Sequence, residues 1–548
     1  ALQLWAKHPQ IVYYTWMLVV LVWLWRQVSA LIKRRWSHKV EGKHNLILLA
    51  ALLLAGLLVV DPFVSVMEFQ GHSTRGAPSV LDKTGETETG TKWNYATAWS
   101  LHPKETVSFI YPNFYGLQNY PTRDVKSAAY WGFLSGTQST HYLGLVVLLM
   151  AILGLTLKKP DSESWLWIIA TVLILLVGFG KNFPLLYRPL FELAPMFSKF
   201  RVPSMIYILL PLTVGVLGAR GLQTVLSTLR GENQQELKKL RSRALIVFGS
   251  IAAISLLLLI FSGSVSYLKA GQNPVSQQVL DLREELFIKG ALIALLISSS
   301  CMAAIWVGIK KIISPLVVGT LLIGVALVDF WIVNHEFLNL SKTTQVEGKF
   351  ERARRSRVIT RLNQDKDNYR ILPVDDPSSN FYGYFGISSV SGYRPVKIRK
   401  YQDLLDAGGL NQDHIRNMLN VKYFVGRQGI QEIGTALPKA WFISEVISLK
   451  DQKTSLEKTL ESFDPAQKAV IVNYDGPQIN PESTGEVIVE SYEEHEIKLK
   501  TSSVTGGVLV LSEIYYAPRW IATVDGEETP IYQTNHVLRS VYVPPGEH

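Results

Sequence analysis

Charged side chains beside the ends of long apolar runs are the first candidates for chemistry in this chain. Asp61 lies at the end of one such run, Glu68 and Arg75 follow it, and Arg201 shortly precedes another. A carboxylate can take the proton from an acceptor hydroxyl, and the planar guanidinium of arginine suits phosphate oxygens. Asp61 and Glu68 are therefore candidate catalytic carboxylates, and Arg201 and Arg75 are candidate phosphate-binding residues.

Each of these residues also has a purely structural explanation. Asp61 can simply end a helix at a membrane surface. Arg201 can anchor the chain to lipid headgroups, and Arg75 can be an ordinary loop residue. The residue types and their spacing leave both interpretations open.

Aromatic side chains are concentrated in the stretch 64–140, which is too long to be a plain connector between two apolar runs. Trp99, Tyr111, Tyr130 and Trp131 stand out in it. Because sugar rings stack on aromatic rings, these four residues are a candidate platform for an acceptor or a sugar. An aromatic belt at the membrane surface would explain the same residues.

The sequence offers little for a metal or nucleotide cofactor. Asp365-Lys366-Asp367 has the DxD spacing with which many sugar-nucleotide transferases hold a divalent metal, but it lies in a polar stretch typical of a turn. The chain contains no phosphate loop of the Walker type, no HExxH and no GxSxG, and its one cysteine is Cys301. We assign no metal ligands and keep a divalent metal only as a hypothesis.

The elements that must position these residues are apolar runs of membrane-spanning length. About eight runs approach the roughly 20 residues needed to cross a bilayer. They cover 10–30, 44–63, 141–157, 165–180, 204–222, 244–262, 288–308 and 313–331. The loop at 181–203 is apolar but repeatedly interrupted by proline, which predicts a re-entrant or surface-lying segment rather than a span.

Lysine and arginine concentrate in the loops that follow odd-numbered runs, and this predicts the orientation. Short cytoplasmic loops carry the excess of basic residues, so the loops 64–140 and 181–203 and the C-terminal region are expected outside. These loops, and not nucleic-acid binding, explain much of the net charge of +10. Because residue 1 is then also outside, we expect an odd number of earlier spans before Ala1, and a further strand after His548.

From residue 332 the composition becomes that of a soluble domain. The region 332–437 mixes helical and strand patterns, and 438–548 is mainly strands with alternating apolar side chains. Asp525-Gly526 between two strands predicts a hairpin, and several short strands at this spacing predict a β-sandwich. The predicted fold is a polytopic α-helical membrane domain over 1–331, followed by an extracytoplasmic α+β domain that ends in a β-sandwich.

Strings in both parts of the chain resemble the bacterial YfhO family of membrane proteins. In the membrane part they are Ser73-Thr-Arg-Gly, Trp99-Ser-Leu-His-Pro-Lys-Glu, Tyr111-Pro-Asn-Phe-Tyr-Gly, Tyr130-Trp-Gly and Phe200-Arg-Val-Pro-Ser. In the soluble part they are Ser391-Gly-Tyr-Arg-Pro, Met418-Leu-Asn-Val-Lys-Tyr, Tyr515-Tyr-Ala-Pro-Arg-Trp-Ile-Ala-Thr-Val-Asp-Gly, Pro530-Ile-Tyr and Val541-Tyr-Val-Pro-Pro-Gly-Glu-His. The resemblance spans most of the chain, and the strings occur in the family's order in the membrane part.

This resemblance implies a GT-C-like glycosyltransferase, an enzyme of the bacterial cytoplasmic (inner) membrane with its active site on the outer face. It implies a polyprenyl-phosphate sugar as donor, an envelope glycan or lipid as acceptor, and membrane lipids as surroundings. It also implies a catalytic carboxylate in the first extracytoplasmic loop, which we expect upstream of Ala1. The alternative is a non-catalytic scaffold or assembly subunit of an envelope membrane complex, which would lack such a carboxylate.

Overall fold

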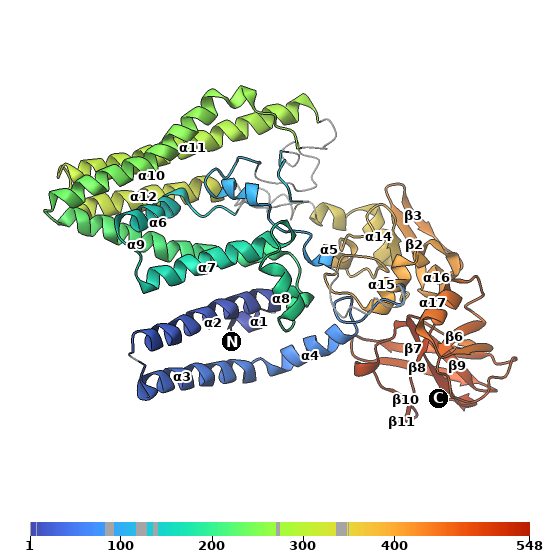
Figure 1. Cartoon of the computed structure of the whole chain (residues 1–548). Coiled ribbons are helices and arrows are strands. Elements are labelled where there is room, and N and C mark those ends of the chain that lie inside the picture. The colour runs from blue at the N-terminus through green and yellow to red at the C-terminus, as the bar shows by residue number, and fades with distance from the viewer. Residues whose placement is uncertain are drawn as a thin grey trace. The chain divides into compact units, whose positions relative to one another are not determined.

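The computed structural model describes residues 2–6, 8–34, 36–82, 93–116, 129–134, 141–269, 275–335, 348 and 350–548. The chain forms two compact units, coloured by residue number in Figure 1. Unit 1 comprises Ala1–Pro62 and Thr91–Leu340, and unit 2 comprises Phe63–Gly90 and Ser341–His548.

Unit 1 is helical. Its long helices are α2 (Pro9–Ile32), α3 (His38–Leu57), α6 (Leu145–Leu157), α7 (Ser162–Phe179), α9 (Leu210–Arg230), α10 (Gln234–Ile260), α11 (Gln277–Ile309) and α12 (Pro315–Asn334). Its short helices are α1 (Leu2–Trp5), α5 (Trp93–Ala96), α8 (Tyr187–Leu193) and the 3-10 helices η1 (Pro103–Phe109), η3 (Gly180–Asn182), η4 (Phe197–Lys199), η5 (Pro203–Leu209) and η6 (Ser262–Ser264). Helix α4 (Val60–Gly71) begins in unit 1 and continues into unit 2.

Seven helices among the described residues are long and apolar enough to cross a membrane. They correspond to seven of the eight apolar runs, because the third run forms only the 13 residues of α6. The proline-interrupted loop at 181–203 forms short helical turns and no membrane-length helix, as its prolines predicted. Each proline removes a backbone donor that a continuous helix needs.

Small residues let the helices of unit 1 approach closely. Where α6 crosses α9, a Cβ on Gly221 would overlap the carbonyl oxygen of Met150, and a Cβ on Gly218 would lie 2.8 Å from the carbonyl oxygen of Val147. Glycine at such crossings brings two helix backbones into direct contact, which favours packing where apolar burial cannot drive it. Gly218 and Gly221 are therefore packing residues.

The carboxylate of Asp329 on α12 is fully buried and caps the start of α6. Its Oδ1 accepts a hydrogen bond from the hydroxyl of Tyr142, and its Oδ2 accepts one from the backbone N–H of Val146 at 3.3 Å. Partners of this kind stabilise a buried carboxylate and satisfy the first N–H groups of a helix. Asp329 thus has a structural role.

Unit 2 contains a six-stranded sheet in the order β4-β9-β13-β12-β6-β5, all antiparallel except the parallel pair β5/β6. These strands are β4 (Ala440–Ile443), β9 (Gly507–Ile514), β13 (Leu538–Val543), β12 (Tyr532–Thr534), β6 (Lys468–Val472) and β5 (Glu445–Leu449). A three-stranded sheet β14-β8-β7 comprises Gly546–Glu547, Ile497–Ser503 and Gly485–Tyr492.

The two sheets pack face to face. Phe442 and Leu509 of the large sheet contact Val487 and Leu499 of the small one, and the next residues along β9 point to the opposite face. That opposite face packs on the helices α15 (Arg399–Asp406), α16 (Asp413–Met418) and α17 (Gln452–Leu460). The alternating pattern of β9 is therefore buried on both sides, as expected for a central strand.

The remaining elements of unit 2 are smaller. A second three-stranded sheet has the order β1-β2-β3, formed by Arg370–Pro373, Val421–Gly426 and Gly429–Glu432. The other helices are α14 (Arg357–Gln364), η7 (Tyr382–Phe385), η8 (Gly409–Asn411) and η9 (Ala517–Arg519). The predicted hairpin at Asp525-Gly526 is confirmed, with positive φ at both residues, and it joins β10 (Ala522–Val524) to β11 (Glu527–Thr529).

A segment from the 64–140 stretch forms part of unit 2. Arg399 donates hydrogen bonds from Nη2 to the carbonyl oxygen of Thr74 at 2.8 Å and from Nε to that of Ala77 at 3.0 Å. Asp403 accepts from the hydroxyl of Ser79 at 2.6 Å. Contacts between residues more than 300 positions apart thus attach this segment to the C-terminal region.

Candidate functional site

Arg201 lies between η4 and η5, and two aromatic rings contact its guanidinium. The distances from Cζ to the ring centroids are 4.1 Å for Tyr95 and 4.8 Å for Trp99. Nη1 also donates a hydrogen bond to the hydroxyl of Tyr95 at 2.5 Å. Stacking of this kind fixes the plane of the guanidinium and is favourable by roughly 0.5–2 kcal/mol. The arginine is held in one orientation, which suits directional recognition of an anion.

Two segments hold the backbone at Arg201 and Val202. The side-chain amide of Gln10 on α2 donates to the carbonyl oxygen of Arg201 at 2.5 Å, and Val202 N–H donates to the carbonyl oxygen of Ala96 at 3.0 Å. Val202 has a φ of 61°, an unusual value for a β-branched residue. Backbone strain is retained only where surrounding contacts determine it, and it is often found at functional positions.

An apolar groove of about 300 Å³ adjoins this assembly. Its walls come from α2, α7, α8 and η5, and nearly all of its lining atoms are apolar. Tyr14 lines the groove, and its hydroxyl accepts a hydrogen bond at 3.0 Å from the same Gln10 amide that binds Arg201. One glutamine therefore links the backbone of Arg201 to Tyr14 in the wall of an apolar groove.

Glu105 is a buried carboxylate in the same group of loops that sequence reasoning did not single out. It is 4% exposed, and its Oε1 accepts hydrogen bonds from the Tyr130 hydroxyl at 2.7 Å, from Leu134 N–H at 3.2 Å and from Phe133 N–H. A side chain on Gly132 would overlap Glu105, so this turn requires glycine. The signal in the sequence was the pairing of two strings, Trp99–Glu105 and Tyr130–Gly132, which the structure brings together.

The four residues of the predicted aromatic platform lie in different surroundings. Trp99 contacts Arg201, while Trp131 packs edge-on against Tyr115 at 4.9 Å between ring centroids. Tyr111 and Tyr130 are 4% and 8% exposed. The hydroxyl of Tyr111 lies 3.2 Å from that of Ser255, and Tyr130 binds Glu105. Of the four, Trp99 is the one that lies at the candidate phosphate-binding residue.

The remaining sequence candidates lie on other elements than Arg201. Asp61 lies in the first turn of α4 in unit 1. Glu68 and Arg75 belong to unit 2, where Glu68 forms an ion pair with Arg519 at 2.5 Å. This pair attaches the end of α4 to the loop after β9, so Glu68 has a structural partner within its own unit.

The two carboxylates of the DxD string form ion pairs with a lysine. Lys422 Nζ lies 2.7 Å from a carboxylate oxygen of Asp365 and 2.7 Å from one of Asp367, and the Tyr423 hydroxyl donates to Asp365 at 2.5 Å. Although burial raises the pKa of Asp365, these hydrogen bonds outweigh it and lower that pKa to about 2. No group of three or more metal-ligating side chains occurs among the residues that the structure describes.

Comparisons of the chain with protein families, with curated proteins and with solved structures give no match.

Proposed function

We propose that this chain is a multi-span membrane protein similar to the YfhO family, and that it transfers a sugar from a polyprenyl-phosphate donor. The acceptor would be a cell-envelope glycan or lipid at the outer face of the bacterial cytoplasmic membrane. The observation that carries the proposal is the stacked guanidinium of Arg201, whose backbone is joined through Gln10 to the wall of an apolar groove. A phosphate on a long hydrocarbon chain needs both features, a cation for the headgroup and an apolar surface for the chain.

The membrane location is supported by the seven membrane-length helices of unit 1. Residues 74–80 and the C-terminal region contact each other within unit 2. Both segments must therefore lie on the same side of any membrane that the chain spans. The distribution of lysine and arginine between the loops favours the outside for that side.

Positive charge is the contribution that Arg201 would make to catalysis. The bond between the sugar and the phosphate breaks with negative charge building up on the leaving phosphate. A fixed guanidinium can stabilise that charge without reorganising at the moment of reaction. Removing one such contact typically costs about 1.5–3 kcal/mol, which is roughly a 10- to 100-fold effect.

A scaffold without catalytic activity is the second candidate, and one observation favours it. Glu105 is the buried carboxylate of these loops, and three donors already occupy its Oε1. A general base must be free to accept a proton from the acceptor hydroxyl. Glu105 as arranged here is a structural residue, so the residues around Arg201 bind a donor more readily than they deprotonate an acceptor.

The test separates lipid binding from sugar transfer. Purified chain in detergent is titrated with polyprenyl phosphate, and membranes containing the chain are supplied with polyprenyl-phosphate-linked sugars. Arg201→Ala should weaken lipid binding and transfer by roughly tenfold or more. Arg188→Ala is the matched control, because Arg188 is an exposed arginine of the same loop, paired with Glu192 at 2.8 Å. It should leave both measurements unchanged.

The outcomes distinguish the two candidates. Lipid binding that depends on Arg201, without transfer from any common donor sugar, would favour the scaffold. Neither binding nor transfer by the wild type would rule out the proposal. Glu105→Gln keeps the Oε1 acceptor, so it should fold normally and retain transfer. A complete loss of transfer in this variant would instead identify Glu105 as the base.

A further inference from the structure

The part of helix α4 that belongs to unit 2 exposes large apolar side chains. They are Phe63, Val64, Val66 and Met67. Each of them is 42–52% exposed in the part of the chain that the structure describes. Successive residues of a helix are turned by about 100°, so these four side chains cover one side of α4. We call them the apolar face of α4, and a contiguous exposed patch of this kind marks a contact surface.

The opposite side of α4 holds the loop that follows β9. Glu68 forms an ion pair with Arg519 at 2.5 Å, and Nη2 of Arg519 also donates to the hydroxyl of Ser65 at 3.4 Å. The rings of Phe69 and Tyr516 pack with their centroids 6.0 Å apart. The spacing of these three α4 residues places them on one side of the helix, roughly opposite the apolar face. The loop therefore leaves the apolar face uncovered.

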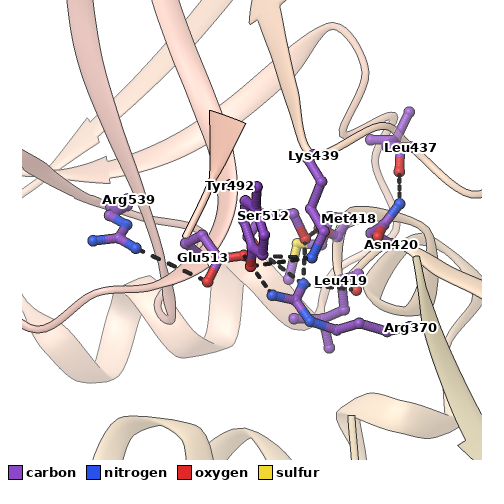
Figure 2. Close-up of polar contacts among 10 residues, drawn as sticks. All are labelled: Arg370, Met418, Leu419, Asn420, Leu437, Lys439, Tyr492, Ser512, Glu513 and Arg539. Carbon is purple, nitrogen blue, oxygen red and sulfur yellow. Dashed lines mark hydrogen bonds and ion pairs between the residues drawn. The ribbon is translucent and has the colours of Figure 1, made fainter. Parts of the chain in front are cut away.

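The same loop is held from its other side by the charged interior of the sandwich. Cζ of Arg539 lies 4.0 Å from the centroid of the Trp520 ring. Figure 2 shows the ion pair of Arg539 with Glu513, which also pairs with Arg370. The next residue of the loop, Ile521, is 75% exposed. The structure thus fixes the chain directly before Ile521 and leaves its apolar side chain at the surface.

The place of α4 in the chain indicates what covers these apolar side chains. Only Leu58 and Val59 separate α4 from α3, one of the seven helices long and apolar enough to cross a membrane. Each helical turn rises about 5.4 Å, so the first turns after a span stay near the membrane surface. Tyrosine, tryptophan and arginine, which the loop carries at 516, 520 and 519, are common at that surface. A lipid surface therefore fits both the helix and the loop.

We propose that the apolar face of α4 and Ile521 form one contact surface of unit 2 with the phospholipid bilayer from which α4 emerges. Both parts enter the boundary between headgroups and acyl chains, to the depth of about 5–10 Å that is usual for interfacial helices. The Glu68–Arg519 pair joins them. The proposal rests on the membrane location of unit 1, and it is independent of Arg201 and of sugar transfer.

The experiment places one nitroxide spin label at a time in the full chain, reconstituted in phosphatidylcholine nanodiscs. Cys301→Ala removes the one native cysteine, Ile521→Cys supplies a label site in the loop, and Val64→Cys supplies one on the apolar face of α4. Oxygen concentrates in the bilayer, whereas a nickel chelate stays in water. Labels at both positions should be accessible to oxygen and protected from the nickel chelate.

Two further label positions provide the reference values. Val504→Cys is the water control, because Val504 is 93% exposed and precedes β9, whereas Ile521 follows it. The eight residues of β9 separate its two ends by roughly 25 Å. Ile47→Cys, near the middle of α3 and 56% exposed, is the lipid control. The oxygen-to-nickel ratio at Ile521 should be close to that at Ile47 and far above that at Val504.

Each result decides the proposal. A label at position 521 or 64 that meets the nickel chelate as freely as the label at 504 lies in water, and this overturns the proposal. A label protected from both reagents is covered by protein, which overturns it as well. If the label at position 47 also behaves as in water, the membrane location of unit 1 is refuted, so the two failures are distinguishable.

A charge swap tests the connection between the loop and α4. Arg519→Glu replaces attraction to Glu68 by repulsion, so the oxygen-to-nickel ratio at position 521 should fall toward the value at position 504. Adding Glu68→Arg restores the pair in reverse and should return the ratio. Arg361→Glu is the control, because Arg361 is an exposed arginine of the same unit, 3.8 Å from Glu432. The same ratio in all these chains would overturn the joining of the two parts by this pair.

Discussion

His536 makes the stability of unit 2 sensitive to acid. It lies in the tight turn between β12 and β13, where Asn535 and His536 have φ values of 45° and 61°. Its side chain is fully buried. Burial, with the nearby charge of Lys400, lowers the pKa of His536 to about 4. The folded protein therefore keeps this imidazole neutral.

The size of the effect follows from linkage. The ordinary value of this pKa is 6.5, so the unfolded chain takes up the proton as the pH falls through 6.5, whereas the folded chain does so only near pH 4. Between these values the unfolded state binds more protons, and the stability contribution, complete above pH 6.5, is lost as the pH falls. At about 1.4 kcal/mol per pH unit the loss at pH 4 is roughly 3 kcal/mol.

The perturbation is His536→Asn, because asparagine tolerates a positive φ and does not titrate. The full chain in detergent is equilibrated in urea at pH 7 and at pH 4.5, and a brief protease pulse reports the folded fraction of unit 2. Wild-type unit 2 should lose more stability between these pH values than His536→Asn does. His495→Asn, at an exposed position, should behave like the wild type.

The absolute stability of the variant does not matter for this comparison, because only the difference between the two pH values is used. An equal loss for wild type and His536→Asn would refute the reasoning. So would a greater loss for the variant, since it would mean that the folded state takes up the proton more readily than the unfolded state does.

Two further predictions concern packing. Gly221→Ala should lower the melting temperature of the purified chain by the equivalent of about 1–3 kcal/mol, because the added Cβ overlaps Met150. Gly215→Ala on the same helix is the control, because its Cβ meets nothing within 4 Å and the change should be neutral. Equal melting temperatures for the two variants would contradict the close crossing of α6 and α9. Asp403→Ala should increase hydrogen exchange in the segment 74–82, because this buried carboxylate holds that segment. Unchanged exchange there would mean that other contacts suffice.

Much of unit 2 follows from local patterns. The break near Gly408-Gly409 separates α15 from α16 as predicted, and the strand that follows them is β2. The hairpin is where Asp525-Gly526 placed it, but its second strand is Glu527–Thr529 and precedes the expected Pro530. The turn-forming residues Asp525-Gly526 determined where the chain reverses direction, whereas the length of β10 and β11 depended on the hydrogen bonds between them.

The candidate sites were only partly visible in the sequence. Arg201 was identified from its place before an apolar run, and its two stacking partners come from a loop about 100 residues earlier. Glu105 was not identified, because a single charged residue in a loop looks like an ordinary surface residue. Its significance lies in its burial and in the three donors that converge on it, which no local pattern records.

The amino-acid sequence by itself determined the long apolar helices, the proline-broken loop and the reversal at Asp525-Gly526. Each of these depends on interactions within a few residues or on the apolar character of one run. Only the tertiary structure decided that the segment 74–82 belongs with unit 2 and that Lys422 pairs with the carboxylates of the DxD string. These outcomes depend on residues distant along the chain, which only folding brings together.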